Sequence, residues 1–171
     1  YHTIRLMIGM TSYQILDEKW EQVEEALKRF ESSVGLGNMR GTEVSKWTNI
    51  THLELVKLTP EECAEGAYLL CQEATFIQYQ INSLQSKIDW CNRKINTIIA
   101  PIIKNQITRY MENDLKRAYA VKQDDVAERL QQIVNEASSY HSRLSYIPNS
   151  LRSQADKLTK YQDIKRSQNY A

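Results

Sequence analysis

The stretch "EECAEGAYLLCQEATFIQYQINSLQSKIDWCNRKI", residues 61–95, decides the fold, because it contains no proline and a single glycine. Apolar side chains recur along it in alternating steps of four and three residues, which is the spacing of a helix with a coiled-coil seam. The seam continues to residue 98 and comprises Cys63, Ala67, Leu70, Ala74, Ile77, Ile81, Leu84, Ile88, Cys91, Ile95 and Ile98. A helix over residues 60–100 would extend roughly 60 Å at about 1.5 Å per residue, so we expect an elongated molecule.

Both ends of this helix carry local signals. Thr59 is a favourable N-cap residue, Pro60 suits the first helical position, and Glu62 completes a capping box with Thr59. At the other end, Pro101 lacks a backbone N–H, which predicts that the helix ends or kinks there.

The same periodicity predicts shorter helices on either side of the long one. The expected ranges are residues 17–34, 103–118, 125–147 and 150–165. Asp17 begins the first range and Gly35 ends it, whereas Asp124 or Asp125 caps the third. Residues 35–58 differ, because they hold three of the five glycines and end in alternating apolar positions. We predict a loop there, followed by an extended stretch over residues 51–58 that could pair with residues 43–47 as a hairpin.

These elements give a mostly α fold class. We predict an elongated antiparallel helical hairpin or coiled-coil bundle, in which the long helix packs against residues 125–147, with a small irregular or β-containing N-terminal segment. Residues 1–58 form the N-terminal helix with its loop and short strand, and residues 59–171 form the bundle. A chain of 171 residues favours one continuous domain over both parts.

Composition excludes several classes of protein. The chain holds 22 basic and 21 acidic residues, so its net charge does not favour nucleic acid or anionic lipid, and any charged surface must come from local segregation. No apolar run reaches the roughly 18–20 residues of a membrane span, and we expect a cytoplasmic protein without a membrane partner. Cys63, Cys71 and Cys91 lie in one predicted helix, too far apart for Cys63 to pair with Cys91, and are expected to be buried free thiols.

Motifs for catalysis are lacking in the sequence. His2, His52 and His141 are isolated from cysteines and carboxylates at metal-ligand spacing, and no phosphate-binding or nucleophile-elbow pattern occurs. We therefore expect no catalytic residues, no metal site and no cofactor, and a protein that is not an enzyme.

Local charge is more informative than net charge. Residues 101–123 and residues 149–171 each carry five basic and two acidic side chains, and tyrosines are interspersed among them. Aromatic rings beside cations are typical of sites for single-stranded nucleic acid, where bases stack and cations follow the phosphates. The alternative is a solvated helix face with tyrosines at its apolar border.

The long helix also has apolar side chains away from its seam. They are Tyr68, Phe76, Tyr79 and Trp90. Two long helices cannot bury two apolar stripes each, so we predict that these four residues contact another subunit of a homo-oligomer.

Two stretches, "INSLQSKIDWCNRKINTI" at residues 81–98 and "LRSQADKLTKYQDIKRSQN" at residues 151–169, resemble the long central helix and the basic C-terminal helix of the UvsY-type recombination mediators of T-even-like phages. The resemblance implies a ring-forming oligomer that binds single-stranded DNA and helps to load a recombinase in place of the single-strand-binding protein. It also implies that Arg93 and Lys94, at the matching end of the long helix, contact DNA.

Two functional hypotheses follow. The first is a non-enzymatic, oligomeric accessory protein that binds single-stranded nucleic acid, with a recombinase or single-strand-binding protein as partner, in the host cytoplasm if a phage encodes it. Its predicted nucleic-acid-binding residues are Arg93, Lys94, Arg152, Lys157, Lys160, Lys165 and Arg166. The second is a structural coiled-coil component of a virion, scaffold or tether, in which the charged faces only contact water.

Overall fold

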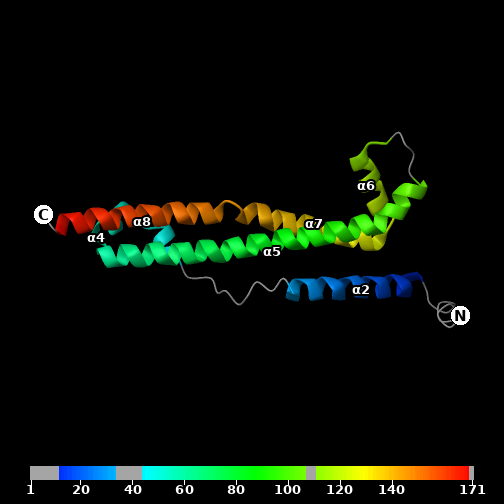
Figure 1. The fold of residues 1–171 in the computed structure, drawn as a ribbon, viewed down its shortest axis with the longest axis horizontal. Coiled ribbons are helices and arrows are strands. Elements are labelled where there is room, and N and C mark those ends of the chain that lie inside the picture. The colour runs from blue at the N-terminus through cyan, green and yellow to red at the C-terminus, as the bar shows by residue number, and fades with distance from the viewer. Residues whose placement is uncertain (1–11, 34–43, 107–110, 170–171) are drawn as a thin grey trace. The chain divides into compact units, whose positions relative to one another are not determined.

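The computed structural model describes residues 12–33, 44–106 and 111–169, and within these ranges every regular element is a helix (Figure 1). The helices are α2 (Ser12–Ser33), α3 (Ser45–Thr48), α4 (His52–Lys57), α5 (Pro60–Gln106), α6 (Asn113–Lys122), α7 (Asp125–Leu144) and α8 (Ile147–Asn169). The mostly α fold class is therefore confirmed. None of these helices combines the length and hydrophobicity needed to span a bilayer.

The long helix α5 starts where the sequence predicts. The backbone N–H of Thr59 donates to Glu62 Oε2 at 2.7 Å, and the N–H of Glu62 donates to Thr59 Oγ1 at 3.2 Å, which closes the capping box.

Of the two outcomes predicted at Pro101, an end or a kink, the end is wrong, because α5 continues through the proline to Gln106. A proline inside a helix costs about 3 kcal/mol. Ile99 is 2% exposed, and Ile102 and Ile103 pack on the same apolar cluster, so tertiary packing on both sides of the proline offsets that cost.

The predicted extended stretch at residues 51–58 is also wrong, because residues 52–57 form helix α4 and residues 45–48 form helix α3. Thr51 and Glu54 make a second capping box, in which the Thr51 N–H donates to Glu54 Oε2 at 2.8 Å. Leu55 and Leu58 both pack on one hydrophobic core, and their spacing of three residues places them on the same side of a helical turn, whereas in a strand they would face opposite sides. The predicted loop at residues 35–43 lies outside the described residues.

Other boundaries also differ from the prediction. The predicted helix over residues 103–118 is wrong in its bounds, because residues 103–106 belong to α5 and α6 spans Asn113–Lys122, and α7 ends at Leu144 rather than at residue 147. Helix α2 begins at Ser12 rather than Asp17, and α8 begins at Ile147 rather than Ser150. Pro148 thus lies in the first turn of α8, where a missing backbone N–H leaves no helical hydrogen bond unmade. The expected cap of α7 is present, because the Ala127 N–H donates to Asp124 Oδ1 at 2.9 Å.

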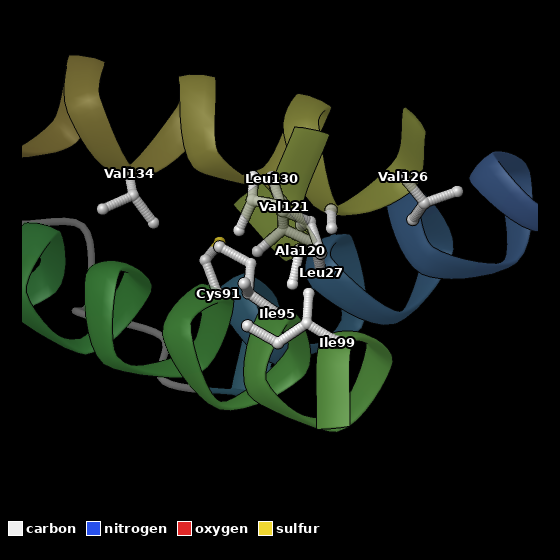
Figure 2. Close-up of a cluster of buried hydrophobic side chains, with 10 residues drawn as sticks. Leu27, Cys91, Ile95, Ile99, Ala120, Val121, Val126, Leu130 and Val134 are labelled. Carbon is white, nitrogen blue, oxygen red and sulfur yellow. The ribbon is translucent and has the colours of Figure 1, made fainter. Parts of the chain in front are cut away.

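The chain divides into two compact units: residues 1–35 with 85–139, called the first unit, and residues 36–84 with 140–171, called the second unit. Figure 2 shows the core of the first unit, where α2, the second half of α5, α6 and α7 meet. Its buried residues are Leu27, Cys91, Ile95, Ile99, Ala120, Val121, Val126, Ala127, Leu130 and Val134. Ile99 replaces the expected Ile98 at the end of the seam, since a straight helix drifts away from a strict seven-residue repeat.

The core of the second unit joins α3, the first half of α5 and α8. Its buried residues are Trp47, Leu70, Ala74, Ile77, Ile81, Leu151, Ala155 and Leu158. Helix α8 also holds the ends of both short helices, because Gln154 Nε2 donates to the carbonyl oxygen of Trp47 at 3.3 Å and Lys165 Nζ donates to that of Val56 at 2.6 Å. These two bonds satisfy helix-terminal carbonyls and fix α3 and α4 against α8.

The three cysteines are free, as expected, but only two are buried. Cys63 and Cys91 occupy seam positions, and burial raises the pKa of both thiols above the ordinary value. Cys71 is exposed, so the expectation of burial is wrong there. It follows Leu70 directly, and adjacent helical residues point about 100° apart.

Candidate functional site

A groove lies between α8 and the α3–α4 segment of the second unit, with a volume of about 420 Å³. We call it the α4–α8 groove. Its lining residues are Ile50, His52, Leu55, Gln154, Lys157, Leu158, Lys160, Tyr161 and Ile164. Most of the α8 members follow helical steps of three and four residues, so one face of α8 supplies that wall. The capping box at Thr51 orients the opposite wall, because it fixes the start of α4.

The charge of the α4–α8 groove is positive. Lys157 and Lys160 are exposed along α8, and the lining contains no carboxylate. The two acidic residues of α8, Asp156 and Asp163, are seven residues apart and therefore lie together on another face. Arg152 lies four residues before Asp156 and shares that face. Helix α8 thus turns Lys157 away from its own acidic residues, whereas Lys160, four residues after Asp156 and three before Asp163, lies next to both carboxylates at the edge of the groove.

Aromatic and apolar side chains lie beside these lysines. Tyr161 is half-buried in the groove, Leu55 is half-buried on the facing wall, and Ile164 is 52% exposed. A ring that is fixed on one side and open on the other can stack on a flat ligand group, while the lysines bind a nearby anion. The groove therefore brings together the cations and the aromatic ring, which the sequence showed only as neighbours in the composition of residues 149–171.

The other predicted basic residues of α8 do not line the groove. Arg152 and Arg166 are exposed elsewhere on the helix. Lys165 donates a hydrogen bond to the carbonyl oxygen of Val56. The hydrogen bonds with Thr59 lower the pKa of Glu62, and the charge of Lys165 lowers it further by a smaller amount. Lys165 therefore acts first as a support for the α4 wall.

Arg93 and Lys94 lie in the first unit, on the exposed face of α5. The Lys94 ammonium is 5.5 Å from the centroid of the Trp90 ring, and Trp90 itself stacks on Phe30 at 5.8 Å between ring centroids. A cation over an indole face gains a modest electrostatic attraction. The predicted DNA-contacting pair and the groove lysines thus belong to different units.

The four predicted interface residues fall into two groups. Phe76 packs on the core of the second unit and Trp90 on that of the first, so both already bury surface within the chain. Tyr68 and Tyr79 are 62% and 41% exposed on α5.

Arg117 is a polar residue that sequence reasoning did not single out. Its Nη1 donates to Gln131 Oε1 and its Nη2 donates to Asn92 Oδ1, both at 2.9 Å, so one guanidinium joins α6 to α7 and α5. It lines a groove of about 410 Å³ in the first unit, but Asp114 and Glu128 line that groove as well and offset its charge. No sequence signal marks it, because its partners lie 14 and 25 residues away.

Sequence reasoning also missed the α4 side of the groove. His52 and Leu55 were assigned to an extended stretch, in which alternate residues would face opposite sides. The Thr-x-x-Glu pattern at Thr51 was the available signal. Within the described ranges, no group of three or more His, Cys, Asp or Glu side chains is arranged to hold a metal ion.

No protein-family model matches the chain, and neither a curated protein nor a solved structure matches it. The resemblance to the UvsY-type mediators, and the roles that it implies for Arg93 and Lys94, rest on the two sequence stretches that carry it.

Proposed function

We propose that the protein is a non-enzymatic accessory factor that binds single-stranded nucleic acid through the α4–α8 groove. The observation that carries this proposal is the grouping of Lys157, Lys160 and Tyr161 in one groove that no carboxylate lines. Lysines track the phosphates, and the exposed edge of the aromatic wall receives an unstacked base. A volume of about 420 Å³ lies within the usual range of about 300–1,000 Å³ for ligand sites.

The pair Arg93 and Lys94 forms a second basic patch in this proposal. Each patch is weak alone, because two exposed lysines or arginines release few counterions from a nucleic acid. Several copies of the chain in one homo-oligomer would add their patches, and linked weak sites bind a polymer far more tightly than one site does. The resemblance to the UvsY-type mediators supports a cytoplasmic role in loading a recombinase onto single-stranded DNA, in place of a single-strand-binding protein.

The first prediction concerns the lysines of the groove. The double variant Lys157→Glu with Lys160→Glu should weaken binding of a fluorescent single-stranded oligonucleotide at least tenfold, because it places two negative charges beside the phosphates. A titration followed by fluorescence anisotropy at low salt measures the change.

The matched control is the double variant Arg152→Glu with Arg166→Glu, which changes the net charge of the same helix equally but lies outside the groove. It should retain most of the affinity. Equal losses in the two double variants would mean that net charge, and not the groove, governs binding. A third variant, Arg93→Glu with Lys94→Glu, tests the patch of the first unit.

A structural coiled-coil role is the second candidate function, favoured by the exposure of Tyr68 and Tyr79 on α5. In that role, as part of a virion, scaffold or tether, the chain would assemble without binding nucleic acid. Absence of oligonucleotide binding at low salt, with an intact oligomer, would favour it over the accessory factor.

A further inference from the structure

Helix α5 presents a second periodic stripe on the side opposite its seam. The stripe consists of Glu65, Tyr68, Gln72, Thr75, Tyr79 and Asn82, and we call it the tyrosine stripe. Its steps are three and four residues in alternation, which is the spacing of a coiled-coil contact. Gln72 follows the buried Leu70 by two residues, so the stripe and the seam point about 200° apart.

All six residues of the tyrosine stripe are exposed. Two of them are large, with Tyr68 62% and Tyr79 41% exposed. Between Gly66 and Ser86, α5 carries one charged residue, Glu73, which lies off the stripe. An exposed helix face usually carries charged side chains for solubility, so a face of uncharged polar and aromatic residues is better suited to a contact.

Four of the six residues of the tyrosine stripe already make a side-chain hydrogen bond within the helix. The Gln72 amide donates to the Tyr68 hydroxyl at 2.7 Å, the Thr75 hydroxyl donates to the Cys71 carbonyl oxygen at 2.9 Å, and the Gln78 amide donates to Asn82 Oδ1 at 3.1 Å. Covering a polar group costs little when that group keeps a hydrogen-bond partner. The stripe can therefore lose its water without leaving these atoms unsatisfied.

We propose that the tyrosine stripe binds the same stripe of a second copy of this chain, with the two α5 helices antiparallel about a two-fold axis. The stripe is self-complementary in that direction. The register that places Tyr68 against Tyr79 of the second copy also places Gln72 against Thr75 and Glu65 against Asn82 of the second copy. The tyrosines thus meet each other on either side of the centre, where Gln72 meets Thr75, and Glu65 meets Asn82 at the two ends.

Charge favours a second copy over a partner of another kind. A two-fold contact brings every residue of the stripe near residues of the same stripe, so it tolerates few charges of one sign. The central four residues carry none, and the outer Glu65 faces an amide that can donate to its carboxylate. A partner that recognised this face by charge would find no charge at its centre. Because the stripe lies on α5 and not on the groove, this contact does not depend on nucleic-acid binding.

Sedimentation of charge variants tests the contact. Wild type should sediment as a dimer or a multiple of dimers. The double variant Tyr68→Glu with Tyr79→Glu should lose the dimer mass and sediment as the half-size species, because each glutamate would face another. The matched control Tyr146→Glu, at a tyrosine that is 68% exposed elsewhere in the same unit, should keep the wild-type mass. At a concentration low enough to keep wild type dissociated, the thermal melting curves of wild type and of the double variant, followed by circular dichroism, should coincide.

A second pair of charges tests the direction. The double variant Tyr68→Lys with Tyr79→Glu should retain the dimer, since the antiparallel register places each lysine against a glutamate of the second copy. In a parallel dimer it would place lysine against lysine and lose the dimer, which would overturn the antiparallel register. A monomeric wild type at all concentrations, or a dimer that survives the two glutamates, would overturn the proposal as a whole.

Discussion

Gly66 shows how one small residue determines the packing of a large one. Trp47, 3% exposed, lies directly on the backbone of α5 at this position. A Cβ atom added at Gly66 would lie 2.6 Å from Cζ3 and 2.7 Å from Cδ2 of the Trp47 ring, with Cε3 closer still. The sequence shows a glycine in a helix but not the tryptophan, 19 positions earlier, that requires it. This contact therefore could not be predicted from the local pattern.

The second prediction concerns Gly66→Ala. Alanine favours the helix over glycine by about 1 kcal/mol, but overpacking a core costs about 1–3 kcal/mol, so we expect a net loss of up to about 2 kcal/mol. Urea denaturation followed by circular dichroism measures it as a lower midpoint at an unchanged slope.

The control for this prediction repeats the substitution in a Trp47→Leu background. The smaller side chain removes the clash, so Gly66→Ala should then stabilise the protein. The difference between the two backgrounds isolates the contact between residues 47 and 66. A higher midpoint for Gly66→Ala in the wild-type background would show that the ring moves aside freely.

For individual elements, the sequence predicts the structure correctly where many residues share one periodicity, and incorrectly where only a few residues carry the pattern. The seam of α5 spans many turns, so each apolar residue supports the same helix, and its start and buried positions were largely predicted. Helix α4 has only six residues, and its two leucines, Leu53 and Leu55, are two residues apart, which is the spacing of a strand. The capping box at Thr51, together with packing on α8, decides for the helix. Packing likewise decides that α5 passes through Pro101.

The third prediction concerns the capping box at the start of α5. Hydrogen bonds from Thr59 lower the pKa of Glu62 below its ordinary value of 4.5. A lowered pKa in the folded state means that the ionised carboxylate stabilises the fold above pH 4.5, and that this stabilisation is lost as the pH falls through the lowered value. Glu62→Gln removes the charge but keeps an acceptor.

We therefore expect Glu62→Gln to melt below wild type at neutral pH and to approach wild type as the pH falls well below 4.5. Thermal melts of both proteins across this range measure the difference. A difference that stays constant with pH would mean that the charge of Glu62 does not contribute to the cap. The exposed Glu61→Gln serves as the neighbouring control, and its difference from wild type should stay small throughout.

At the scale of the whole molecule, the chain forms two units from interleaved segments. Each unit contains one part of α5 together with helices from a later stretch of the chain. The sequence alone does not reveal which later segment packs on which part of α5. The groove illustrates this limit, because its walls come from residues 50–55 and 154–164. The basic and aromatic composition of α8 was visible in the sequence. The selection of Lys157 and Lys160 over Arg152 and Arg166 required the packing of α4.

The most direct measurement of the central claim is the salt dependence of oligonucleotide binding. For single-stranded nucleic acid, the slope of log affinity against log salt is about −0.7 for each phosphate neutralised. If Lys157 and Lys160 each contact one phosphate, the double variant Lys157→Gln with Lys160→Gln should have a slope shallower than wild type by about 1.4 for each groove that the strand occupies. Arg152→Gln with Arg166→Gln should leave the slope unchanged. A groove variant with the wild-type slope, or a wild type that does not bind at low salt, would contradict the account.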